Sequence, residues 1–159
     1  MGEIVKAIQD TYADEISWCY GCGRLNKNGH HFRTGWDDEK TITYFEPSEE
    51  HMAIPGFVYG GILASLIDCH GTGSASIYLH HKNGHQIGDG TEPPRFVTAQ
   101  LTVDYKKPTP QGIELKAYGF GEEIHPKKWK ITTEVLAGED VVATGEVIAV
   151  IAPETFLKK

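Results

Sequence analysis

The spacing of apolar residues changes along the chain, and each change predicts a different element. Ile4, Ile8, Tyr12 and Ile16 recur at every fourth position, as residues on one face of a helix do, so we expect a short N-terminal helical extension over about residues 1–18. A loop rich in Gly, Asn and Lys follows. Two short strands around HFRTGW and TITYFEP, joined by the polar turn DDEK, then predict a hairpin.

The most apolar stretch runs from Pro55 to Leu79, and its length predicts a helix from about Tyr59 to Leu79. The polar stretch HHKNGHQIGDGTEPP after it is rich in Gly and Pro and predicts a loop. Polar and apolar residues alternate through the last third, and short polar turns separate the segments, which is typical of an antiparallel meander. The four predicted strands are RFVTAQLTVDYKKP, GIELKAYGFGEEI, KWKITTEVLA and DVVATGEVIAVIA.

One long, nearly all-apolar helix beside six predicted strands indicates an α+β fold. An antiparallel sheet has an apolar face that must be covered, and this helix is the element able to cover it. We therefore expect a single domain over residues 1–159, in which a curved antiparallel sheet wraps around one long central helix.

Composition and charge narrow the class of protein. The apolar share of 40% and the charged share of 23% are ordinary for a soluble globular protein. No segment reaches the roughly 18 uninterrupted apolar residues of a membrane span. The N-terminus lacks a basic start followed by an apolar core, so we expect a cytoplasmic protein. The net charge of −7 argues against sequence-independent binding of nucleic acid, which requires a basic surface.

Local basic groups leave room for a small anionic ligand, although solvated surface is the commoner role of any single lysine. These groups are Arg95, Lys106, Lys107, Lys127, Lys128 and Lys130.

Two motifs, PGFVYGGILASLID and VTAQLTVDYKKPTP, resemble segments of the hotdog-fold thioesterases. The similarity is to the group that contains the phenylacetate-pathway thioesterase and the mammalian thioesterase-superfamily members. It covers about residues 19–151 and includes CYGCG followed by NKNG. The family pattern is His-Gly-Gly with an Asp seven residues after the second glycine, and Gly60, Gly61 and Asp68 keep this spacing. Tyr59 replaces the family histidine, and Ala53 stands where some members carry Asn or Gln.

The resemblance implies hydrolysis of an acyl-CoA thioester without a cofactor, in a homodimer or a dimer of dimers. It assigns the Gly60 amide to the oxyanion, Asp68 to the base or nucleophile, and Thr98 to contact with the water or with Asp68. Helix N-termini carry unpaired N–H groups and partial positive charge, which suits an oxyanion. The structural alternatives are a tight turn at the glycines, an outward-facing Asp68, and a threonine favoured by strand propensity.

Other residues near the motif have weaker assignments. Tyr59 and His51 are candidates for part of the missing histidine's role, and Lys106 and Lys107 are candidate substrate contacts. A non-catalytic acyl-CoA-binding module is an alternative that Tyr59 and Ala53 favour. A hotdog hydratase or dehydratase is a weaker one, because such enzymes pair an acid with a histidine five residues later, where this chain has Gly73.

The chain contains three cysteines, too few for a disulfide framework and consistent with a reducing compartment. Cys19 and Cys22 form a C-x-x-C pair followed by His30 and His31. Structural zinc usually has two paired ligand sets, and adjacent histidines on a strand point to opposite faces, so we expect no metal. Cys69 and the neighbouring His70 diverge by about 100° on a helix, and we expect them to be packing residues.

Overall fold

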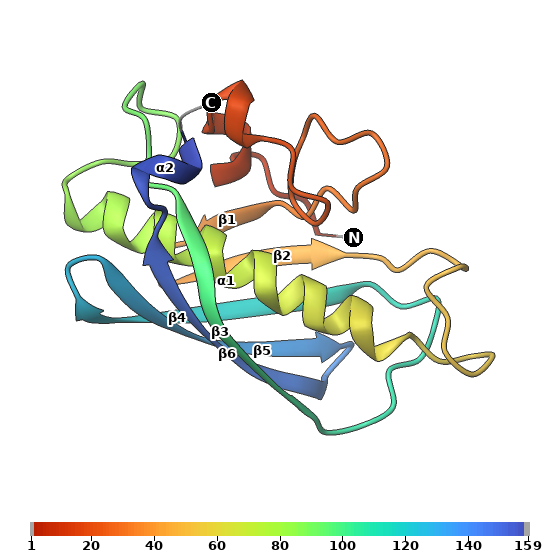
Figure 1. Cartoon of the computed structure of the whole chain (residues 1–159). Helices are drawn as coiled ribbons and strands as arrows, with labels where there is room; N and C mark the ends of the chain where they lie inside the picture. Colours follow the sequence, from red (N-terminus) through yellow and green to blue (C-terminus); the bar gives the residue numbers. More distant parts are fainter. Residues whose placement is uncertain (1, 158–159) are drawn as a thin grey trace.

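The computed structural model describes residues 2–157, and it consists of one six-stranded antiparallel sheet curved around a long helix (Figure 1). The strand order is β1-β2-β4-β5-β6-β3. The strands are β1 (Thr34–Asp37), β2 (Lys40–Phe45), β3 (Phe96–Tyr105), β4 (Leu115–His125), β5 (Lys128–Ala137) and β6 (Asp140–Ile151). The helices are α1 (Gly60–Lys82), α2 (Glu154–Leu157) and two 3-10 helices, Ile8–Thr11 and Asp14–Ile16. The predicted curved antiparallel sheet around one long helix is confirmed.

The core lies between α1 and the concave face of the sheet. Leu66 and Ile67 on α1 are fully buried, as are Ile131 on β5 and Val147 on β6. Buried and exposed residues alternate along β5, because successive strand side chains point to opposite faces of the sheet. Each fully buried Leu, Ile or Val stabilises the fold by about 1.5–3 kcal/mol. The predicted amphipathic strands therefore supply one wall of the core and α1 supplies the other. None of the helices within residues 2–157 combines the length and the apolarity needed to span a bilayer.

The helix approaches the sheet closely at a glycine. A Cβ on Gly71 would lie 2.5 Å from Cγ2 of Val147, so only glycine allows α1 to lie this close to β6. The buried His70 next to it bonds through Nδ1 with the hydroxyl of Thr43, 2.7 Å away. This bond satisfies a polar group inside the core, and burial lowers the pKa of His70 to about 3, so His70 is neutral.

The predicted N-terminal helical extension over about residues 1–18 is helical only in part. The structure has two short 3-10 helices, and the chain is extended between them at Tyr12. The fourfold apolar spacing reflects separate docking contacts: Ile8 and Tyr12 pack with Ile77 of α1. The buried Gln9 accepts a hydrogen bond of 2.7 Å from the Thr34 backbone N–H, which fixes the segment to β1.

The predicted four-strand meander is only partly correct. Strands β4, β5 and β6 are neighbours in sequence order, but β3 pairs with β6 at the far edge of the sheet and does not touch β4. The connection after β3 runs past the start of α1, where the Val58 N–H donates to the Thr109 carbonyl. Strand β3 is consequently an edge strand, and most of its side chains are exposed.

We predict that Gly71→Ala destabilises the fold even though alanine is the better helix former. The gain in helix propensity is about 1 kcal/mol, whereas forcing a methyl group against a β-branched strand residue costs typically 1–3 kcal/mol and displaces β6. Chemical denaturation should show a lower free energy of unfolding. Ser65→Ala, on the partly exposed face of the same helix, is the control and should change it little. A more stable Gly71→Ala protein would mean that α1 and β6 are not in close contact.

Candidate active site

The centre of the candidate site is a carboxylate held by one hydroxyl. Asp68 lies in the middle of α1 and is partly buried where the helix packs on β3. The Thr98 hydroxyl donates to Asp68 Oδ1 across 2.5 Å. The register of β3 with β6 shifts between Thr98 and Gln100. Irregularities of this kind re-aim side chains, and this one adjoins the residue that contacts Asp68.

The surroundings make Asp68 a stronger base than an exposed aspartate. Burial raises the pKa of its carboxyl group, and the Thr98 hydrogen bond and the positive charge of Arg95 oppose that rise only in part. The carboxylate is still partly open to solvent. Such a group can accept a proton from water or attack an electrophile.

The second part of the site is the first turn of α1. Tyr59 is the N-cap residue and makes no side-chain capping hydrogen bond. Within residues 2–157, the Gly60 and Gly61 N–H groups have no backbone acceptor outside the helix, and the first N–H groups of any helix have none within it. The Tyr105 hydroxyl donates to the Gly60 carbonyl across 2.7 Å. The helix end therefore offers two amides and the positive end of its dipole.

Tyr59 folds back over this helix end. A Cβ on Gly61 would lie 2.3 Å from the Tyr59 ring, so the ring occupies the space above that glycine. The ring is 57% exposed, so it can swing away at little cost in burial. Tyr59 therefore lies where a substrate carbonyl would approach the amides.

A cavity of about 310 Å³ adjoins the same helix end. Lys106 and Lys107 line it together with Gly60 and Tyr105, so the structure places the two predicted lysines next to the predicted oxyanion donors. The Lys107 ammonium pairs with the exposed Asp140 carboxylate at 3.0 Å. This combination of lysines and helix amides favours an anionic ligand.

Other predicted residues are not brought to the site. The His51 side chain accepts a hydrogen bond from the Ser48 N–H, and its ring lies 5.2 Å from that of His30. Only its carbonyl touches the helix start, by accepting the Tyr59 N–H at 2.9 Å. The lysines at 127, 128 and 130 lie at the turn between β4 and β5 and on β5 itself.

One chain cannot bring both halves of the site to the same atom. Gly60 and Asp68 are eight residues apart, which corresponds to about 12 Å along the helix axis. The face between them carries small, partly exposed residues, Gly61, Ala64 and Ser65. Beside that face the edge strand β3 exposes Leu101 and Tyr105. The site is thus an open surface in the single chain.

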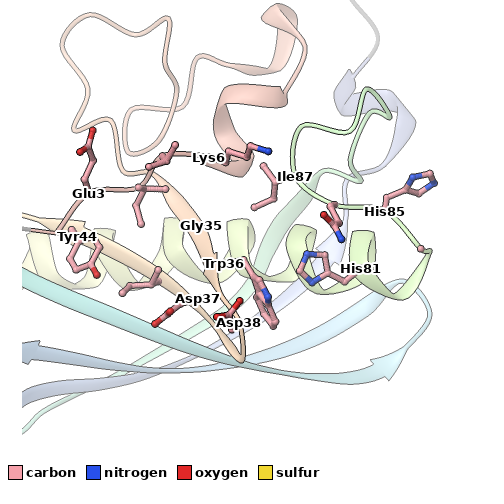
Figure 2. Close-up of a pocket in the computed structure, with 15 residues that line it drawn as sticks. Glu3, Lys6, Gly35, Trp36, Asp37, Asp38, Tyr44, His81, His85 and Ile87 are labelled. Carbon is pink, nitrogen blue, oxygen red and sulfur yellow. The ribbon is translucent and has the colours of Figure 1, made fainter.

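A larger cavity, of about 840 Å³, lies elsewhere (Figure 2). Its walls come from the N-terminal segment, from β1 and from the end of α1, and include Lys6, Trp36, Asp37 and His81. Neither Asp68 nor Thr98 lines it, so this cavity does not serve the carboxylate.

Sequence reasoning missed three residues near the site. The sequence indicated Tyr105 only as part of a strand pattern, Arg95 only as a candidate contact for an anionic ligand, and Cys69 only as a packing residue. Cys69 is buried, but its sulfur also lies 3.9 Å from that of Cys19. Each of these contacts joins segments far apart in the sequence, so no local pattern could have indicated them.

Comparison with known proteins identifies the family. No family model matches the chain. A thioesterase superfamily protein from Shewanella loihica is similar in structure, with 43% identity, a TM-score of 0.64, and coverage of 77% of this chain and 91% of that one. The PaaI protein of the E. coli phenylacetic acid degradation operon has a TM-score of 0.62 over 78% of this chain and 81% of its own, with 14% identity, and so shares the fold. The chain belongs to the thioesterase superfamily and has the hotdog fold.

Among curated proteins, acyl-coenzyme A thioesterase THEM4 of Xenopus laevis is 29% identical over 112 residues, which are 70% of this chain. The chain matches only 44% of the length of that relative.

We predict that Asp68→Asn leaves the fold as stable as before or stabilises it by at most about 1 kcal/mol, because a partly buried charge is removed. A raised pKa means that the ionised group opposes folding, so the gain in stability should appear above the pKa of an unfolded aspartate and vanish in acid.

Thr98→Val should instead destabilise the fold by about 1–3 kcal/mol, because it leaves the carboxylate without its donor. Thermal unfolding at pH 7 and in acid measures both. Strong destabilisation by Asp68→Asn would assign Asp68 a structural role.

Proposed function

We propose that this protein hydrolyses an acyl-CoA thioester to a carboxylic acid and free CoA. The observation that carries the proposal is the partly buried Asp68 carboxylate, held by the Thr98 hydroxyl on a face of small residues that leads to the unpaired amides of Gly60 and Gly61. Membership of the thioesterase superfamily supports the reaction class.

The proposed reaction starts with the thioester carbonyl oxygen at the amides of the α1 N-terminus, with the Gly60 N–H as the leading donor. Asp68 removes a proton from a water molecule, whose oxygen adds to the carbonyl carbon. The tetrahedral oxyanion then collapses, the carbon–sulfur bond breaks, and the CoA thiolate takes up a proton. In the other route an Asp68 oxygen attacks the carbonyl carbon, the carbon–sulfur bond breaks, and the CoA thiolate leaves and takes up a proton. Water then hydrolyses the mixed anhydride, which releases the carboxylic acid and restores the Asp68 carboxylate. Thr98 positions the carboxylate in both routes.

A second copy of the chain completes the site in this proposal, as a homodimer or a dimer of dimers. Because Gly60 and Asp68 are about 12 Å apart along one helix, a carbonyl at one cannot reach the other. Two helices packed antiparallel through their small-residue faces would bring the Gly60 end of one chain to the Asp68 of its partner. The exposed edge of β3 offers a surface for such pairing.

The CoA portion fits the cavity at the helix start. Its phosphates would meet Lys106 and Lys107, and the helix dipole adds to their attraction. All three cysteines are free thiols, which agrees with a cytoplasmic setting.

A non-catalytic acyl-CoA-binding module is the second candidate. The observation that favours it is the Tyr59 ring over Gly61, because the ring must move before a carbonyl can reach the amide. The hydratase alternative has less support: Gly73 faces Gln9 and Thr34 inside the core and offers no acid–base group.

The test is thiol release from a panel of acyl-CoA substrates, from acetyl to long-chain and aryl. Asp68→Asn should lower turnover by roughly a hundredfold or more, the scale of a catalytic base, and Thr98→Ala by about tenfold. Glu134→Gln removes one carboxylate charge from an exposed position on β5, away from β3 and the start of α1, and is the control, with turnover unchanged. Wild-type turnover in Asp68→Asn, with folding checked by circular dichroism, would contradict the mechanism. Acyl-CoA binding with no turnover in any variant or in the wild type would favour the binding module.

A further inference from the structure

The three cysteines converge on one point beside α1. The sulfurs of Cys19, Cys22 and Cys69 all lie within 4.8 Å of one another. Cys19 and Cys22 come from the loop before β1, and Cys69 comes from the middle of α1, 50 residues after Cys19. Cys22 and Cys69 are buried, and Cys19 is half-buried. Cys69 is far from the C-x-x-C pair in the sequence, and the fold places its sulfur beside those of Cys19 and Cys22 as a third possible ligand.

The separation of the sulfurs fits a shared metal ion. Zn–S bonds of about 2.3 Å at tetrahedral angles place two thiolates about 3.8 Å apart. The Cys19 and Cys69 sulfurs are 3.9 Å apart. A disulfide requires about 2.05 Å and uses two sulfurs, which would leave the third without a function.

The loop backbone packs closely against the sulfurs. A Cβ on Gly21 would lie 2.3 Å from the Cys69 sulfur, so glycine lets the loop backbone come against it. The Gly23 N–H donates to the Cys19 carbonyl at 2.7 Å, which closes a tight turn over residues 19–23.

The charges around the three sulfurs also fit a bound zinc ion. Arg95 interacts electrostatically with all three sulfurs. Three thiolates and one Zn²⁺ carry a net charge of −1, which the Arg95 guanidinium neutralises.

We propose that Cys19, Cys22 and Cys69 bind one Zn²⁺ through three thiolates, with a water molecule as the fourth ligand on the half-buried side of Cys19. Binding releases the thiol protons of the cluster to solvent. The ion joins the loop at residues 19–22 to α1, one residue from Asp68. The histidines that follow the C-x-x-C pair are not ligands: the His30 ring packs on Tyr20, and His31 Nε2 bonds with the Asn26 carbonyl at 2.5 Å.

The site is tested with the full chain, reduced and freed of metal, by titration with Co²⁺ and then with Zn²⁺. We expect one Co²⁺ per chain, with thiolate charge-transfer absorption, displacement by Zn²⁺, and a rise in melting temperature. Cys69→Ser should weaken binding by at least about a hundredfold, since loss of even an outer-sphere partner can cost that much. His31→Ala is the matched control and should bind as the wild type does.

Cys19→Ser repeats the test at a half-buried position, where the fold is less at risk than at Cys69, and circular dichroism checks both proteins. The site is refuted if the reduced chain shows no thiolate–cobalt absorption. It is also refuted if folded Cys69→Ser binds Co²⁺ as tightly as the wild type does and His31→Ala binds it more weakly. A Cys19 disulfide that forms in air and is unaffected by Zn²⁺ would replace the metal site with a redox pair.

Discussion

The carboxylate of Asp68 lies in the contact between α1 and β3, and the Thr98 hydroxyl is its hydrogen-bond partner within residues 2–157. A charged group in this position opposes folding unless something nearby favours it. The concave sheet holds the helix, the irregular register of β3 sets Thr98, and Arg95 adds a positive charge. The proposed chemistry depends on this balance between burial of the Asp68 charge and its contacts with Thr98 and Arg95. A carboxylate that is neither fully solvated nor fully paired can act on a substrate.

The two sides of α1 have different roles, one in packing and one in the proposed site. The side toward the sheet carries Leu66, Ile67 and the close contact of Gly71, and it fixes the helix in one position. The other side carries Gly61, Ala64, Ser65 and Asp68, which are partly exposed and mostly small. A helix anchored on one side can present reactive groups on the other without losing its geometry, and small residues leave room for a substrate or a second helix.

The sequence predicted the sheet and the long helix because their patterns are local: alternation marks β5, and the apolar run marks α1. It also indicated Gly60, Asp68 and Thr98, through a motif spacing shared with a family. It failed where the outcome depends on distant partners. The N-terminal residues dock on α1 singly and form no continuous helix, and β3 crosses to the far edge of the sheet. The convergence of Cys69 with Cys19 and Cys22 likewise arises only when the loop folds onto the helix.

The central claim is that the amides at Gly60 of one chain and the carboxylate of Asp68 of another act on the same carbonyl. It is tested most directly by co-expressing Gly60→Val and Asp68→Asn chains with different affinity tags and isolating the mixed dimer. One of its two sites then combines the intact half of each chain, so the account predicts about half of the wild-type turnover from two chains that are each inactive alone. A mixed dimer no more active than its parents would contradict the shared site.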